Sequence, residues 1–68
     1  MQLSARNQLK GIIKDIKKGP VSTEVTIDVG VQSMVVASIT TGSAESMELK
    51  VGDDVSALVK ASSVMIMK

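Results

Sequence analysis

The sequence contains no cysteine, no histidine and no aromatic residue among its 68 residues. Without cysteine the chain can form neither a disulfide bond nor a thiolate metal site. Without histidine it lacks the commonest general base and the commonest metal ligand. Its seven acidic residues are scattered, and their spacing does not match a calcium-binding loop. We therefore expect no bound metal cation, no catalytic residues and no enzyme activity, and we interpret Asp53-Asp54 as a hairpin turn.

The absence of Phe, Tyr and Trp also argues against a nucleic-acid-binding domain, which is a rival interpretation for a small β protein. Domains of that kind stack bases on aromatic side chains, and the net charge of +1 offers no electrostatic substitute. No stretch approaches the roughly 20 apolar residues that span a bilayer. The N-terminus lacks the apolar centre of a secretory signal. We expect a cytoplasmic protein without nucleic-acid or membrane partners.

Apolar residues make up 44% of the sequence, which is a high share for one domain spanning residues 1–68. A domain near the lower size limit for independent folding cannot bury that much apolar surface inside itself. We expect the excess to be buried between subunits of a homo-oligomer. The five methionines are interpreted as core and interface packing rather than as a copper site.

The alternation of apolar and polar residues predicts five β-strands and one helical turn. The strands are expected at residues 8–17, 21–29, 32–40, 55–60 and 64–67, and the turn at 43–47 with Ser43 as its N-cap. In the first strand we expect Ile12 and Ile16 on one face and Ile13 on the other. In the third, the apolar run at 34–37 predicts a strand covered on both faces.

This order of elements predicts an all-β fold, a small five-stranded OB-like Greek-key barrel. An open sheet and an SH3-like barrel are alternatives. Three short stretches near strand ends carry hydroxyl groups, backbone N–H groups or fixed cations, and no carboxylate, at residues 4–8, 40–43 and 60–63. Such donor-rich stretches suit the binding of a small oxyanion.

Four segments carry a family resemblance. They are SARNQLKG at residues 4–11, ITTGS at 39–43, LKVGD at 49–53 and ALVKASSVM at 57–65. Together they closely resemble the molbindin (Mop) family of small molybdate-binding proteins, over essentially the whole chain. The resemblance implies an OB-like barrel that assembles as a homohexamer, a trimer of dimers. It also implies storage of molybdate, and of tungstate, as oxyanions held between subunits; a molybdate-responsive regulatory module is the alternative.

Transferred by position, the resemblance implies an oxyanion site formed by the opening motif, by the stretch after the fourth strand and by the end of the third. Its expected members are Ser4, Arg6, Lys60, Ala61, Ser62, Thr40 and Ser43. Thr40 and Ser43 have a competing role as caps of the helical turn. A second oxyanion site is expected at the turn formed by Pro20, Val21 and Ser22.

Overall fold

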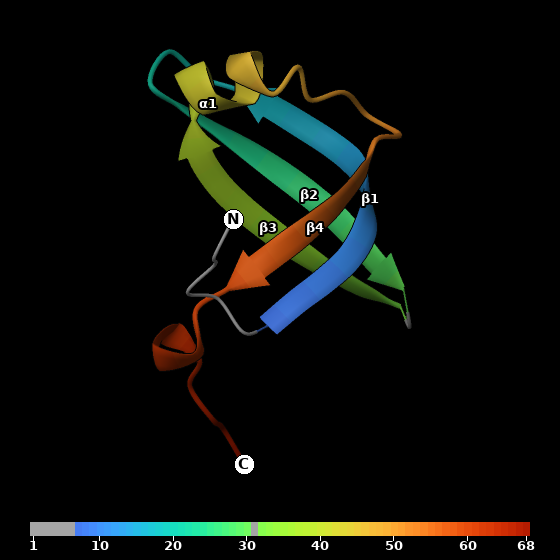
Figure 1. Ribbon diagram of the computed structural model, residues 1–68, viewed down its shortest axis with the longest axis vertical. Coiled ribbons are helices and arrows are strands. Elements are labelled where there is room, and N and C mark those ends of the chain that lie inside the picture. Colours follow the sequence, from blue (N-terminus) through green and yellow to red (C-terminus); the bar gives the residue numbers. More distant parts are fainter. Residues whose placement is uncertain (1–6, 31) are drawn as a thin grey trace.

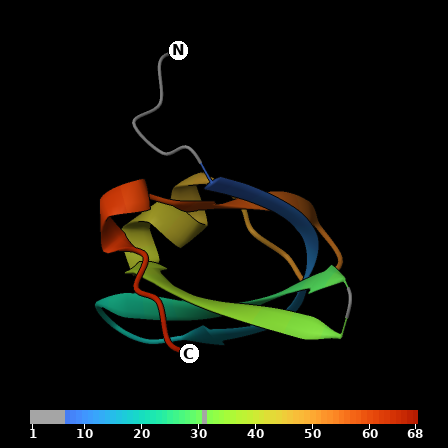
Figure 2. The same ribbon diagram turned by 90° about the horizontal axis from the view of Figure 1, so that it is seen from below.

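The computed structural model describes residues 7–30 and 32–68, which form one antiparallel sheet with a short helix at one end (Figure 1). The sheet has the strand order β3-β2-β1-β4. Seen along its longest axis, the sheet curls because β1 bends: the start of β1 lies beside β4 at the top of the view, and β1 then curves down one side to end beside β2, with β3 next to β2 (Figure 2). The elements are β1 (Asn7–Lys18), β2 (Ser22–Gly30), β3 (Ser33–Thr40), α1 (Thr41–Ser46), β4 (Asp54–Val59) and the 3₁₀ helix η1 (Ala61–Ser63).

The interior of the curled sheet holds a small apolar core. Its buried members are Ile13, Val25, Ile27 and Ala57, and Leu49 packs against them from the loop that follows α1. The alternation predicted for residues 21–29 is confirmed over residues 23–27, where Thr23, Val25 and Ile27 are buried, but not at Val21, which precedes β2 and is 77% exposed. Burial of these side chains holds β1, β2 and β4 together.

A β-bulge in β1 corrects the predicted faces of the first strand. The pairing with β2 shifts between Ile13 and Asp15, which adds one residue to β1. As a result Ile13 is buried and Ile16 is half-buried against the core, whereas Ile12 is exposed on the outer face. The prediction that Ile12 and Ile16 share a face was therefore wrong, since strict alternation does not survive an inserted residue.

The helical turn begins earlier than predicted. Helix α1 starts at Thr41, and its N-cap is Thr40 rather than Ser43. The Thr40 hydroxyl oxygen accepts a hydrogen bond from the Ser43 backbone N–H at 3.1 Å. An N-cap residue has extended backbone angles, and its side-chain oxygen accepts a hydrogen bond from the N–H group three positions later. This bond satisfies one of the N–H groups that have no acceptor at the start of a helix.

The predicted fifth strand does not pair within the described part of the chain. After η1, residues 64–67 are exposed and belong to no strand. Within one chain, the sheet of residues 7–30 and 32–68 is therefore a curled half-barrel, and the prediction of a five-stranded barrel was wrong. The outer face of β3 is also open, with Met34 and Val36 exposed, so a single chain does not cover this strand on both faces.

Candidate oxyanion-binding site

The stretch after β4 forms a compact turn that presents small groups to solvent. Lys60 is the N-cap of η1, and its carbonyl accepts a hydrogen bond from the Ser63 N–H at 2.9 Å. Ala61 and Ser62 are the first residues of η1, a position at which backbone N–H groups have no acceptor within the helix. Lys60, Ala61 and Ser62 are all exposed. The turn thus brings together the Lys60 ammonium group, the Ser62 hydroxyl and the backbone N–H groups of Ala61 and Ser62.

The start of β1 lies beside this turn. Asn7 pairs with Val59 at the end of β4, so the residue that follows Arg6 lies next to the residue that precedes Lys60. Ser4 and Arg6 themselves lie outside the described residues. The register of β1 and β4 is consistent with the expectation that the two stretches act together.

Thr40 and Ser43 form two hydrogen bonds with each other. The Thr40 hydroxyl donates to the Ser43 hydroxyl oxygen at 2.8 Å and accepts from the Ser43 N–H. The structure therefore shows the capping role for Thr40. The hydroxyl hydrogen of Ser43 stays available for another acceptor, because Ser43 Oγ acts only as the acceptor in that pair.

The Pro20-Val21-Ser22 turn packs against the start of α1. The Thr41 N–H donates to the Val21 carbonyl at 2.9 Å, and Ser22 is the register partner of Thr40. The structure thus groups the expected second site with the end of the third strand. We call residues 20–22 with 40–43 the helix-end group, and residues 60–62 the η1 group.

The helix-end group and the η1 group lie far apart in one chain. Along the longest axis, α1 stands near one end of the molecule, and η1 lies toward the other end, beyond the end of β4 (Figure 1). A single site formed within one chain would require these strand ends to converge. Within one chain they do not, because β3 and β4 end on opposite sides of the curled sheet. A site that uses both groups needs more than one chain.

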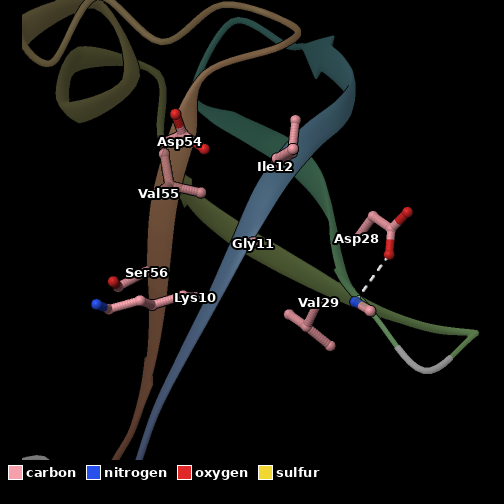
Figure 3. Close-up of a pocket in the computed structure, with 9 residues that line it drawn as sticks. Lys10, Gly11, Ile12, Asp28, Val29, Asp54, Val55 and Ser56 are labelled. Carbon is pink, nitrogen blue, oxygen red and sulfur yellow. Dashed lines mark hydrogen bonds between the residues drawn. The ribbon is translucent and has the colours of Figure 1, made fainter.

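A further hollow on the surface is lined by residues of β1, β2 and β4, none of which is among the expected oxyanion-site residues. It has a volume of about 770 Å³, and Lys10, Asp28, Asp54 and Ser56 border it (Figure 3). At one side of this hollow, the Gly30 N–H donates a hydrogen bond to Asp28 Oδ1 at 2.9 Å. Two carboxylates beside one ammonium group disfavour an oxyanion here. The strand register, which sequence alone does not fix, brings Asp28 and Asp54 to either side of Ile12.

Other kinds of site find no support in residues 7–30 and 32–68. No group of three or more acidic, histidine or cysteine side chains is placed to hold a metal ion there. Among the helices of this described part, none has the length and apolar character needed to cross a membrane.

Comparison with known proteins defines the class of domain. The model of the TOBE domain family matches residues 3–66, which is nearly the whole chain. In the solved structure of a molybdate-binding protein from Sporomusa ovata, the fold is the same over the full length of both chains. The TM-score is 0.93 and the sequences are 38% identical. This chain is therefore a TOBE domain.

Two further relatives narrow the class. The molybdenum transport protein ModE of Azotobacter vinelandii is 47% identical over 66 residues, which are 97% of this chain and 24% of that protein. A molybdate-bound structure of the cytoplasmic molybdate-binding protein ModG has a TM-score of 0.83 and 36% identity, over 90% of this chain and 43% of that chain. The chain spans about a quarter of the length of the ModE relatives that it matches. It belongs to the molbindin (Mop) family of molybdate-binding proteins, which bind their ligand without catalysis.

Proposed function

We propose that this chain binds molybdate, and tungstate in the same way, and releases it unchanged. The family membership and the donor chemistry of the η1 group support this proposal together. Molybdate is a tetrahedral dianion whose oxygens accept hydrogen bonds. Lys60 supplies a cation, Ser62 a hydroxyl and Ala61 a backbone N–H, with no carboxylate among these three residues. Ser4 and Arg6 of the opening motif complete the set that we propose.

The main structural observation behind the proposed location of the site is the distance between the η1 group and the helix-end group. One chain holds the η1 group and the helix-end group apart, so we propose that the site forms where subunits of a homohexamer, a trimer of dimers, meet. Thr40 and Ser43 then belong to the same site only through a neighbouring chain. We propose the turn at 20–22 as part of a second oxyanion site at such an interface.

A site built between subunits makes ligand binding and assembly reciprocal, since a ligand that binds only the assembled state stabilises it. Reversible capture of this kind suits an intracellular store that buffers molybdate. We place this store in the cytoplasm, as is stated for the relative ModG.

Binding to single-site variants tests the proposal. Isothermal titration calorimetry with molybdate would compare the parent chain with Lys60→Ala and with Lys50→Ala, a control that removes an exposed lysine from the loop before β4. A charge-assisted hydrogen bond contributes about 1.5–3 kcal/mol, so Lys60→Ala should weaken binding by roughly ten- to a hundredfold. The control should leave the affinity unchanged. Equal affinities in all three proteins would remove Lys60 from the site.

The second candidate function is a molybdate-responsive module that acts on a partner protein. The match to about a quarter of ModE favours it, because there the same domain is part of a longer protein. Affinity purification from extract, with and without molybdate, separates the two functions. A partner retained only in one condition indicates the module, and the store predicts no ligand-dependent partner.

A further inference from the structure

The outer face of the sheet carries a row of side chains that crosses all of its strands. Ile12 on β1 is the register partner of Asp54 on β4 and of Asp28 on β2, and Asp28 is in turn the partner of Met34 on β3. Register partners in an antiparallel pair project to the same face of a sheet. The row therefore alternates carboxylates with apolar side chains, and Figure 3 shows its members on β4, β1 and β2. We call Asp54, Ile12, Asp28 and Met34 the outer row.

The outer row is accessible, and its charges are not paired with cations of the same sheet. Ile12 and Met34 are 42% and 57% exposed. Asp54 is exposed and Asp28 is half-buried. The one ion pair in the described part of the chain lies beside α1 and involves neither aspartate. Carboxylates without a cation, set beside exposed apolar side chains, are complementary to a partner that presents cations and apolar groups together.

The rest of the outer face adds to this negative charge. Asp15 and Glu24 also occupy register positions on that face. Four of the seven acidic residues of the chain thus lie there, although the net charge of the chain is +1. Even with Lys10, Lys14 and Lys17 all counted on this face, carboxylates outnumber ammonium groups. A local excess of negative charge attracts a basic partner.

The spacing of the outer row matches a helix rather than an extended segment. Neighbouring strands lie about 4.8 Å apart, so the two aspartates are about 10 Å apart with Ile12 midway. On one face of an α-helix, residues i and i + 7 are about 10.5 Å apart, and residue i + 3 or i + 4 lies midway. Side chains on one face of an extended segment recur every 7 Å or so, roughly, which fits neither distance. A helix with basic residues at i and i + 7 and an apolar residue midway therefore fits the row.

We propose that the outer row docks a basic amphipathic helix of a partner protein. Lys or Arg side chains of that helix pair with Asp54 and Asp28, and the apolar residue between them packs on Ile12. The next apolar residue along the same helix face reaches Met34. Recognition of one face of an amphipathic helix is a recurring mode of protein binding. The outer row shares no residue with the η1 group or the helix-end group, so this interaction goes beyond molybdate binding and requires no molybdate.

Binding of a defined helical peptide tests the proposal. The peptide is a fluorescein-labelled, alanine-rich helix with Lys at i and i + 7 and Leu midway, closed by a lactam staple because short unstapled helices are marginal in water. Fluorescence anisotropy would follow its titration with the parent protein at low salt and without molybdate. We expect saturable binding that weakens as salt is added, since exposed charges are screened. A control peptide with its second Lys at i + 5, on a different side of the helix, should bind at least about threefold more weakly.

Acidic variants locate the binding surface. Asp28→Asn combined with Asp54→Asn should weaken peptide binding by about two- to thirtyfold, as expected for the loss of two exposed ion pairs. Asparagine at position 28 keeps a side-chain oxygen for the Gly30 N–H, and far-UV circular dichroism would check that the sheet is retained. Glu45→Gln combined with Glu48→Gln is the matched control, because it removes two charges at and beside α1. This control should leave the affinity unchanged.

The same measurements separate the other possible occupants of the face. Equal loss of binding in both double variants, or equal binding of the two peptides, would show attraction to net charge alone and would overturn the proposal. Native mass spectrometry of the Asp28→Asn, Asp54→Asn variant identifies a second copy: a change in oligomer mass would show that another subunit covers the row, which would also overturn it. Absence of peptide binding to the parent protein up to about 1 mM would do the same. Unchanged oligomer mass together with weakened peptide binding is the expected result.

Discussion

Two buried threonines, Thr23 and Thr41, are joined by a hydrogen bond that we call, with the bond from Thr41 to Gly19, the hydroxyl relay. We predict that removing the two hydroxyl groups one at a time lowers stability by unequal amounts. The Thr41 hydroxyl donates to the Gly19 carbonyl at 2.6 Å. It also lies 2.9 Å from the Thr23 hydroxyl, and both side chains are buried. Since the single hydrogen of Thr41 is used on Gly19, Thr23 must be the donor to Thr41. The relay ties β2 and α1 to the turn of the expected second oxyanion site.

Valine has the shape of threonine without the hydroxyl, so Thr23→Val and Thr41→Val test the relay with little change in packing. Thr23→Val removes one donor and leaves Thr41 bonded to Gly19, which should lower the free energy of unfolding by about 1 kcal/mol. Thr41→Val removes two hydrogen bonds and leaves the Thr23 hydroxyl buried without its partner. That change should cost about 3 kcal/mol. The double variant should cost less than the sum, because it leaves no stranded hydroxyl.

Urea unfolding followed by far-UV circular dichroism measures these differences, since the chain has no aromatic fluorophore. With a slope of about 1 kcal/mol per molar urea, the midpoints should fall by about 1 M and about 3 M. All proteins should be compared at one concentration because assembly contributes to stability. Thr26→Val is the control, since the Thr26 side chain makes no hydrogen bond within the described residues. A larger loss for Thr23→Val than for Thr41→Val would refute the relay.

Four further outcomes are expected. Gly11→Ala should lower the free energy of unfolding by about 1–3 kcal/mol, because the added Cβ would lie 2.5 Å from the Asp28 backbone oxygen; an unchanged urea midpoint would contradict this. Ile13→Ala should cost about 2–5 kcal/mol, since Ile13 is fully buried, and calorimetry would detect it. Lys18→Ala should cost less than about 1 kcal/mol, because its ion pair with Glu45 is exposed on both sides, and a larger salt-sensitive loss would show otherwise. Molybdate at a hundred times its dissociation constant should stabilise the protein by about 2.7 kcal/mol in thermal unfolding, and sulfate should not.

The sequence predicted the paired strands well because their patterns are local. Alternation in β2 placed Thr23, Val25 and Ile27 on the buried face, as observed. Gly52, in the turn-like sequence before β4, has the positive φ of +96° that glycine readily adopts. These features depend on neighbouring residues only, so a single sequence carries them.

The predictions that were wrong concern features that depend on residues far apart in the sequence. The bulge at Ile13 arises from the pairing of β1 with β2, and no local pattern marks it. The segment 64–67 reads as a strand because its composition is that of a strand, but a strand requires an edge to pair with. In the described part of the chain, residues 64–67 pair with no strand. For the same reason the sequence could not show that the expected donor residues are distributed over two ends of the molecule.

The central claim is that molybdate binds to an assembly rather than to a single chain. Native mass spectrometry of the protein, before and after addition of molybdate and with sulfate as the control, tests it most directly. We expect a hexamer that gains discrete molybdate masses and no sulfate. A monomer, or an oligomer whose mass does not change with molybdate, would contradict it.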